Sequence, residues 1–382
     1  MMRFREGLAA VLVLACAATG VRADVAGAIA SIKAVDHAGK GHKAAVAAVQ
    51  ELSKAPPAEL PVILTAMTGA NPLAANWLAG AFEAIADREL KQGGKLPADA
   101  LEQFVRDTKQ DAAARRLAYE WLRKVDPAVE DRLIPGMLKD PGSAFRRDAV
   151  QRLITAAEAK LAADEKEAAK AGFQEALQGA TDDDQVKAIV KPLKELGVDV
   201  DLQQHFGFLT RWKLIAPFNN VGLVGFDTVY PPEKELKFDA KYVGKEDKDV
   251  AWTDHATTDE YGVVDLAKAL SPFKGAVSYA ATEFNAPQAE TVELRLGTPN
   301  AWKLWVNGEL AFARDEYHRG TRLDQYKVQV HLKPGRNVIL LKVCQNEQTE
   351  DWAQDWKFQI RVSDSSGAAI LPAGDKVSFL ER

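Results

Sequence analysis

The segment that decides the fold of the second half of the chain is Trp302-Lys303-Leu304-Trp305-Val306-Asn307-Gly308-Glu309-Leu310. Asn307-Gly308 lies between two apolar runs and predicts a two-residue β-hairpin turn, because both central residues of such a turn need a positive φ. A second turn is predicted at Lys333-Pro334-Gly335-Arg336, where proline suits the first corner and glycine the second. Residues 326–332 alternate polar and apolar side chains, which is the period of a half-buried strand.

Further strand-like segments lie on both sides of this hairpin. They are residues 209–216, 276–284, 289–296, 301–306, 310–313, 337–345 and 356–362. Short strands joined by such turns predict a β-sandwich or jelly roll. Trp305 and Trp356 follow strand patterns and are expected in its core, together with Trp302. Cys344 lies in an apolar strand and is expected to be an inert, buried thiol.

The order of these motifs is similar to a known family. Val292-Glu293-Leu294-Arg295-Leu296-Gly297 precedes the W-V-N-G hairpin, and Leu332-Lys333-Pro334-Gly335-Arg336-Asn337-Val338 and the strand from Trp356 follow it. From about Phe208 to Asp364 the chain resembles the galactose-binding-like jelly-roll domains that accompany many glycoside hydrolases and polysaccharide lyases. This resemblance implies a non-catalytic fold that binds carbohydrate or another partner. The whole chain also resembles secreted proteins of planctomycete-type bacteria that have no assigned activity.

The first half of the mature chain differs in composition from the second. Residues 24–200 hold 39 Ala and seven aromatic residues, whereas residues 201–382 hold 18 Ala and 22 aromatic residues. Alanine favours helices and aromatic residues favour strands, so a multidomain α + β chain is predicted, with a helical domain over residues 24–200 and the sandwich over residues 201–382. Apolar residues three and four apart predict helices at 42–55, 58–68, 72–90, 97–108, 112–124, 128–139, 144–163, 166–178 and 184–196.

These helices are short and must pack on neighbours to be stable. A loose pattern of a basic residue followed by a leucine six positions later recurs at Arg116, Arg147 and Lys187. It resembles an irregular HEAT-like array of paired helices, and a compact helical bundle is the alternative.

The N-terminal segment has the three parts of a secretory signal peptide. Arg3 and Arg5 precede an apolar run over residues 8–18, and Val21-Arg22-Ala23 fits a small-x-small cleavage site. We therefore expect residues 1–23 to be removed and the protein to be exported to the periplasm, cell envelope or medium. Val13-Leu14-Ala15-Cys16 also approximates a lipobox, so lipidation at Cys16 is the alternative and the expected route to a membrane.

Charge and cysteine content exclude several classes of protein. The formal net charge is −5, and the chain has two cysteines. Without a basic excess, no nucleic-acid partner is expected. Two cysteines provide neither a disulfide framework nor a thiolate zinc cluster.

Candidate binding residues lie in loops of the predicted sandwich. Aromatic side chains bind sugars by stacking on their C–H groups, and amides and carboxylates bind hydroxyl groups. Trp252 and Trp352 lie in polar segments, the loop at residues 345–355 is rich in amides and carboxylates, and residues 315–322 combine basic and aromatic side chains. The predicted ligand-binding residues are Trp252, Tyr317, His318, Arg319, Gln345, Asn346, Glu347 and Trp352.

No cofactor is expected, although the carboxylates of the loop at residues 345–355 leave Ca²⁺ open as an alternative. The sequence contains no metalloprotease, nucleophile-elbow, dinucleotide-binding or phosphate-loop motif, so no catalytic residue is predicted. The leading hypothesis is an exported, non-catalytic protein whose jelly roll binds a glycan or a cell-envelope partner, with the helical domain as scaffold. The alternatives are a pure protein-interaction scaffold and a part of a polysaccharide-degrading enzyme.

Overall fold

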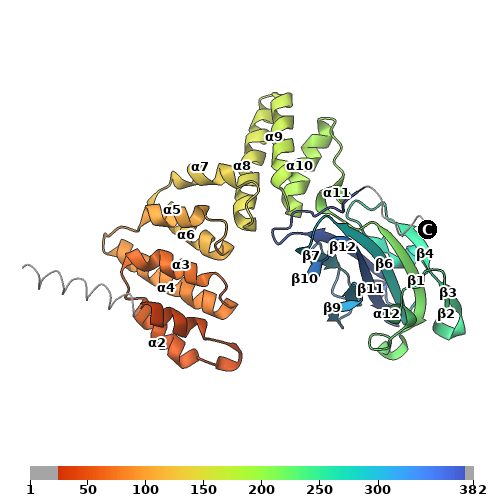
Figure 1. Ribbon diagram of the computed structural model, residues 1–382. Coiled ribbons are helices and arrows are strands. Elements are labelled where there is room, and N and C mark those ends of the chain that lie inside the picture. Colours follow the sequence, from red (N-terminus) through yellow and green to blue (C-terminus); the bar gives the residue numbers. More distant parts are fainter. Residues whose placement is uncertain (1–24, 375–382) are drawn as a thin grey trace, which may run out of the picture. The chain divides into compact units, whose positions relative to one another are not determined.

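The computed structural model describes residues 25–374 (Figure 1), so the expected signal peptide, its cleavage site and Cys16 lie outside the described residues. The chain divides into two compact units, Met1–Leu153 and Ile154–Arg382, and each is described by itself below.

The first unit is helical. After helical residues 25–33, its elements are η1 (His37–Gly39), α2 (His42–Leu52), η2 (Pro57–Glu59), α3 (Leu60–Met67), α4 (Pro72–Lys91), α5 (Ala98–Arg106), α6 (Ala112–Val125), α7 (Val129–Leu133) and η3 (Ile134–Met137). Side-chain caps fix where two of these helices begin: Asn71 accepts a hydrogen bond from the Ala74 backbone N–H, and Asp111 accepts one from that of Ala114. The helices predicted from the apolar spacing are confirmed, and their ends differ by a few residues.

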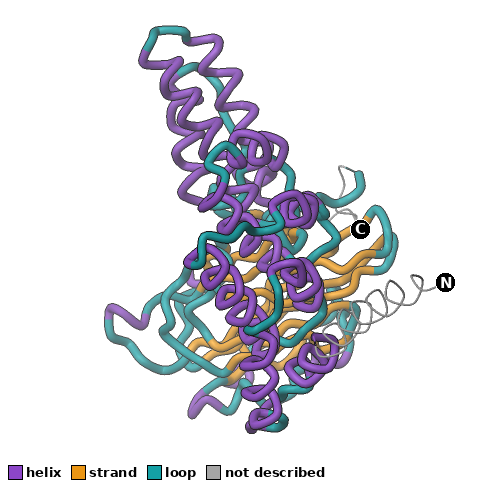
Figure 2. Tube along the Cα trace, turned by 90° about the vertical axis from the view of Figure 1, so that its left-hand side faces the viewer, coloured by secondary structure: helices purple, strands orange, loops and turns teal. Residues whose placement is uncertain are grey.

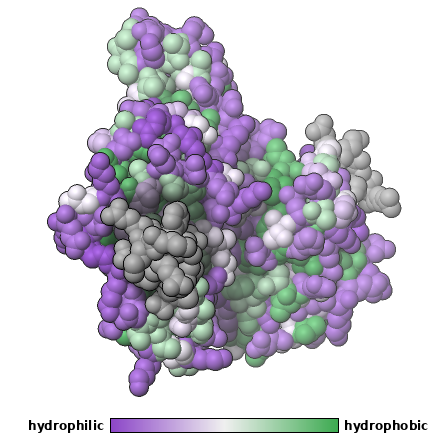
Figure 3. Space-filling view, turned by 60° about the vertical axis from the view of Figure 1, so that its left-hand side comes forward, coloured by the Kyte–Doolittle hydropathy of each residue, from purple (hydrophilic) through white to green (hydrophobic). Residues whose placement is uncertain are grey.

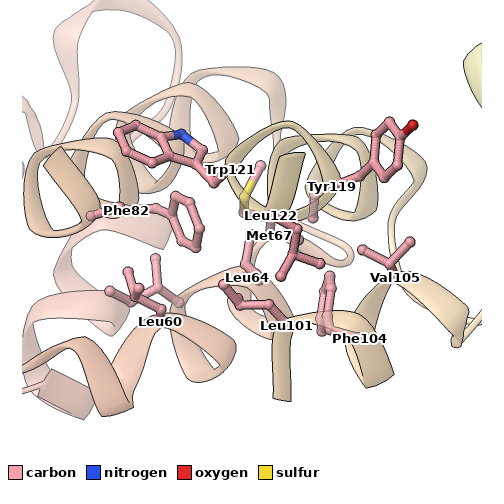
Figure 4. Packing of buried hydrophobic residues seen from close by; sticks show 14 of the residues in the cluster. Leu60, Leu64, Met67, Phe82, Leu101, Phe104, Val105, Tyr119, Trp121 and Leu122 are labelled. Carbon is pink, nitrogen blue, oxygen red and sulfur yellow. The ribbon is translucent and has the colours of Figure 1, made fainter. Parts of the chain in front are cut away.

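The core of the first unit lies between successive helix pairs. α3 packs on α4, α5 packs on α6, and α3 also contacts α5 and α6. Figure 4 shows the buried side chains that these helices contribute, among them Leu64, Phe104 and Leu122, all almost fully buried. Contacts restricted to neighbouring pairs are typical of stacked helix pairs.

α8 (Ser143–Ala162) crosses the boundary between the units, and α9 (Lys166–Gly179), α10 (Asp183–Glu195) and α11 (Leu202–Phe206) belong to the second unit. The compact second unit therefore begins in the middle of a helix, whereas composition had placed the domain boundary near residue 200. These helices are tied to the sandwich by side chains. The Tyr261 hydroxyl donates to Oδ1 of Asp183 at 2.7 Å, and an Arg361 guanidinium nitrogen donates to the Phe206 carbonyl.

The rest of the second unit is a sandwich of antiparallel strands, drawn in orange in Figure 2. Its strands are β1 (Arg211–Asn219), β2 (Lys241–Val243), β3 (Asp249–Ala251), β4 (Thr253–Ala256), β5 (Val264–Asp265), β6 (Ala276–Ala286), β7 (Glu290–Gly297), β8 (Ala301–Val306), β9 (Glu309–Arg314), β10 (Tyr326–Leu332), β11 (Gly335–Gln345) and β12 (Lys357–Ser363). A six-stranded sheet has the order β4-β1-β6-β11-β8-β9, and a four-stranded sheet has the order β10-β7-β12-β5. β2 and β3 form a small separate ribbon. The predicted fold class is confirmed.

Apolar side chains fill the space between the two main sheets. Trp212, Trp302 and Trp356 are buried there with Phe358, whose ring packs edge-on against Trp212 at 4.9 Å. Trp305 is also buried, but on the opposite face of the six-stranded sheet. The prediction that these tryptophans belong to the core is confirmed, and so is the burial of Cys344.

The outer face of the six-stranded sheet is covered by residues 219–252. This segment contains η4 (Val221–Leu223), α12 (Pro231–Lys234), η5 (Lys245–Asp247) and the β2–β3 ribbon. Its Phe226 and Trp252 pack with Tyr279 of β6 and Trp305 of β8 in a second apolar cluster. The sequence did not predict this cover, because β2 to β5 are too short to show a period.

Both predicted turns are present. Asn307 and Gly308 have φ values of 52° and 86°, as the two-residue hairpin turn requires, and Gly335 has a φ of 79° at the second corner of the other turn. The buried Asn337 side chain holds that second turn in place: its Oδ1 accepts from the Lys333 N–H, and its Nδ2 donates to the Gly335 carbonyl.

Within residues 25–374, no helix is long and apolar enough to cross a membrane. On the face drawn in Figure 3, hydrophilic side chains cover most of the surface and apolar side chains form smaller groups.

Candidate functional site

Two connections of the sandwich meet at one end of β11 and bring most of the predicted binding residues together. One joins β9 to β10 and carries Tyr317, His318 and Arg319, and the other joins β11 to β12 and carries Asn346 and Trp352. The side-chain amide of Asn346 lies 2.7 Å from Nε2 of His318, 28 residues apart in sequence. Because an amide nitrogen donates, the imidazole Nε2 is the acceptor in this contact.

Trp352 is the exposed aromatic residue of this surface. It lies in η6 (Asp351–Ala353), and 61% of its surface is open to solvent. The His318 ring packs perpendicular to the indole with 4.7 Å between ring centroids. His318 has a φ of 58°, a left-handed conformation that histidine adopts at less cost than most residues. We call Trp352, His318, Asn346 and the neighbouring Gln348 the Trp352 surface.

The buried side chain of Gln345 holds the connection between β11 and β12 in place. Its side chain is 1% exposed, its Nε2 donates to the Ala353 and Asp355 carbonyls, and its Oε1 accepts from the Asn346 backbone N–H. These bonds bend the chain so that Trp352 faces outward. Gln345 therefore positions this surface, whereas the sequence had suggested a direct ligand contact.

Tyr317 and Glu347 connect the Trp352 surface to residues 219–252. The Asn220 side chain donates one hydrogen bond to the Tyr317 hydroxyl at 3.1 Å and another to the Gln345 carbonyl. Burial raises the pKa of Tyr317, which stays protonated. Glu347 accepts a hydrogen bond from the Gly222 backbone N–H at 2.7 Å.

Arg319 lies at the edge of the Trp352 surface. It is exposed, and its Nε lies 3.2 Å from a carboxylate oxygen of Glu316. Such an exposed pair is weak, so the guanidinium can exchange this carboxylate for that of a ligand.

Trp252 does not belong to the Trp352 surface. It is 9% exposed, and its ring packs against Phe238 at 5.1 Å beneath the cover of the six-stranded sheet. The prediction that it is available for stacking is wrong, because residues 219–252 fold onto the sheet and bury it. The polar residues around it in the sequence concealed this burial.

The carboxylates of the 345–355 loop have separate partners. Glu347 accepts from Gly222, and Asp355 pairs with Lys357 at 2.8 Å. In the part of the chain that the structure describes, no group of three or more His, Cys, Asp and Glu side chains is placed to hold a metal ion.

A concave feature lies on the outer side of the four-stranded sheet. It is a groove of about 860 Å³, lined among others by Gln359 and Lys357 of β12, Thr321 of the β9–β10 connection, Tyr261 and, from α10, Lys187. Sequence reasoning missed it because its lining comes from four separate stretches of chain. The available signal was the polar alternation of β12, which places Lys357 and Gln359 on one face.

Comparisons with known proteins were made for sequence and for structure. No protein-family model and no curated protein matches the chain. Among solved structures, a family 35 carbohydrate-binding module from Clostridium thermocellum matches at 16% identity, over 22% of this chain and 69% of the module, with a TM-score of 0.16. A β-glucosidase from Kluyveromyces marxianus matches at 16% identity, over 40% of this chain and 16% of the enzyme, with a TM-score of 0.23. These similarities are too low to carry an argument about function.

Proposed function

We propose that the protein is an exported glycan-binding protein whose sandwich contacts sugar at the Trp352 surface. The observation that carries the proposal is the exposed indole of Trp352, supported from the side by His318 and flanked by the amides of Asn346 and Gln348. An open aromatic face stacks on the C–H groups of a sugar ring, and neighbouring amides bind its hydroxyl groups.

The packing of His318 against Trp352 favours ligand binding. His318 is held by Asn346, whose Nδ2 also lies 2.7 Å from Oε1 of Gln348, so three side chains are fixed before a ligand arrives. Ordering a flexible side chain costs about 0.5–1.5 kcal/mol on binding, and a surface ordered in advance avoids that cost.

A glycan array probed with the purified chain tests the proposal. We expect binding to a subset of glycans, and we expect Trp352→Ala to weaken it at least tenfold. Leu310→Ala is the matched control, because Leu310 is an exposed apolar residue of the same unit outside the Trp352 surface. If the folded protein binds no glycan, or if Trp352→Ala binds as the unchanged chain does, the proposal is wrong.

A protein-binding surface is the second candidate, and one observation favours it. Val221, Leu223 and Val224 are exposed, and the Gly222 N–H among them bonds to Glu347 next to the Trp352 surface. Contiguous exposed apolar side chains are typical of protein-interaction sites. Capture of a cell-envelope protein that Leu223→Asp abolishes, without any glycan binding, would favour this function.

Export is part of the proposal and is tested separately. Sequencing of the N-terminus of the protein recovered from its cells distinguishes a chain that begins at Asp24 from one that begins at a lipidated Cys16. A chain that retains Met1 and stays in the cytoplasm would contradict export.

A further inference from the structure

Side chains of β12 point alternately to the two faces of the four-stranded sheet, and those on the outer face line the groove. Phe358 and Ile360 point into the sandwich core, so Lys357 and Gln359 point to the other face. That face forms the floor of the groove. Thr321, Leu323 and Tyr261 also line the groove, together with Asp183 and Lys187 of α10. All of these residues belong to the second unit.

Gln359 is the exceptional residue of this floor. It is 5% exposed and lines the groove, and its side-chain amide makes no hydrogen bond to any described residue. Neither amide atom of Gln359 is among the enclosed side-chain atoms without a partner, so the amide opens to the groove. An amide in this position can offer both a donor and an acceptor to a ligand bound in the groove.

Thr321 lines the same groove, but its hydroxyl oxygen is enclosed and has no hydrogen-bond partner among the described residues. A ligand in the groove therefore meets the amide of Gln359 and not this hydroxyl group.

Gly297 explains how the β9–β10 connection comes to lie beside Gln359. It lies directly opposite Gln359 in the β7–β12 pairing. A Cβ atom at Gly297 would lie 2.4 Å from the Arg322 carbonyl oxygen and 3.1 Å from Nε2 of Gln359. The missing side chain therefore lets the backbone that follows Thr321 lie against the sheet beside the Gln359 amide.

The charges of the groove cancel and are already paired. Its lining holds three Asp (Asp183, Asp259 and Asp265) and three Lys (Lys187, Lys268 and Lys357). Lys187 and Lys268 pair with Asp183 and Asp265, and Lys357 pairs with Asp355 outside the lining. Asp259 accepts from the Tyr261 and Val263 backbone N–H groups.

His255 adds no charge at neutral pH, because burial lowers its pKa. A neutral ligand with hydroxyl groups can bind the Gln359 amide without displacing any of these pairs. A volume of about 860 Å³ lies within the usual range of small-molecule sites.

We propose that this groove is a second binding site, for a neutral saccharide, in which the Gln359 amide forms hydrogen bonds with sugar hydroxyl groups. The site is separate from the Trp352 surface, and it rests on the proposed function for the ligand being a sugar. Tyr261 provides the aromatic wall, and its orientation is fixed by the hydrogen bond from its hydroxyl to Asp183.

Isothermal titration of the full chain tests this inference, with neutral disaccharides (cellobiose, maltose and lactose) as probes and glucuronic acid and glucosamine as charged comparisons. The test variant is Gln359→Met, which keeps the approximate shape of the side chain and removes its hydrogen-bonding groups. Gln329→Met is the matched control, since Gln329 lies exposed on β10 of the same sheet outside the groove.

We expect a neutral disaccharide to bind, and we expect Gln359→Met to weaken its binding about five- to tenfold while the control leaves it unchanged. Gln359→Met removes an amide that has no partner in the described part of the chain, so the variant is expected to unfold no more easily than the unchanged chain. This second measurement separates loss of a ligand contact from loss of structure.

The outcomes distinguish the two sites. Binding that depends on Gln359 but not on Trp352 supports the groove and contradicts the Trp352 surface. Binding that depends on Trp352 alone overturns the groove. Tighter binding of glucuronic acid or glucosamine than of the neutral probes overturns the neutral class, and a complete absence of saccharide binding overturns both proposals.

Discussion

The ammonium group of Lys342 lies 2.8 Å from Oε1 of Glu233, and this ion pair ties the central strand β11 to the segment that covers its outer face. The lysine is fully buried, and it also donates to the Phe226 and Thr228 carbonyls of the cover. All three of its N–H groups therefore have partners. The same segment carries Asn220 and Gly222, whose hydrogen bonds reach the connection that bears Trp352.

Lys342→Ala is expected to lower the free energy of unfolding by roughly 3–5 kcal/mol, because it leaves Glu233 buried without its charge partner. Chemical denaturation followed by circular dichroism measures this change. Lys303→Ala is the control: Lys303 pairs with the exposed Asp227, and a surface pair contributes at most about 1 kcal/mol. Equal effects of the two substitutions would contradict the importance of the buried pair.

Asn346→Ala is expected to loosen the Trp352 surface without unfolding the sandwich. The substitution removes the partner of His318 Nε2, which is worth about 1 kcal/mol, and frees the ring that packs against Trp352. Acrylamide quenching, measured as the difference from a Trp352→Phe background, reports the exposure of this indole. Quenching as in the unchanged chain would show that Asn346 does not hold the surface together.

Protonation of Asp324 at acidic pH is expected to lower the free energy of unfolding. Burial by itself raises the pKa of Asp324, but hydrogen bonds and charge from Arg361 and Arg295 outweigh it, so the pKa lies below its usual value. A carboxylate whose pKa is lowered by folding stabilises the native state above its unfolded pKa, and this contribution disappears as the pH falls through the folded value. We expect the free energy of unfolding to decrease as the pH falls below about 4.

Asp324→Asn tests this contribution. Asparagine tolerates the left-handed φ of 56° at this position but cannot neutralise two buried guanidinium groups. The variant is expected to be less stable at pH 7 and to lose part of the decrease between about pH 4 and pH 2, measured by denaturation at each pH. Asp254→Asn, at an exposed pair with Lys213, serves as the control. An unchanged pH profile in Asp324→Asn would exclude this carboxylate as the cause.

Cys344 is expected to resist thiol reagents in the native protein. Burial raises the pKa of its thiol to about 12, so almost no thiolate is present at pH 8, and the side chain is fully enclosed. Iodoacetamide labelling located by mass spectrometry should modify Cys344 in denaturant and leave it unmodified without it. Rapid labelling of the native chain would show that the outer cluster of the six-stranded sheet opens.

The sequence predicted elements that depend on neighbouring residues. Asn307-Gly308 defines its turn because both φ values follow from the local chain, and the long strands β6, β10 and β11 show a period over many residues. The helices of the first half are equally regular. The short strands β2 to β5 gave no such signal, since two to four residues are too few to establish a period.

The candidate sites depended on contacts between distant residues. Loop composition selected His318, Asn346 and Trp352 as candidates from two separate loops, and the structure places them side by side. Loop composition failed for Trp252, which lies in an equally polar stretch and is nevertheless buried within the 34-residue cover, residues 219–252. Whether a loop tryptophan is exposed depends on the element that packs over it, and no local pattern records that.

By itself, the sequence determined the α + β class, the order of the long elements and the geometry of the two turns, since these follow from propensity and period. The tertiary structure decided which face of each sheet is covered, and it placed Gln359, Gly297 and the backbone of Arg322 side by side from three separate segments. The physical reason is that burial and hydrogen-bond satisfaction are properties of the packed chain. A glutamine becomes a candidate ligand contact when the folded protein buries it and leaves its amide without a partner.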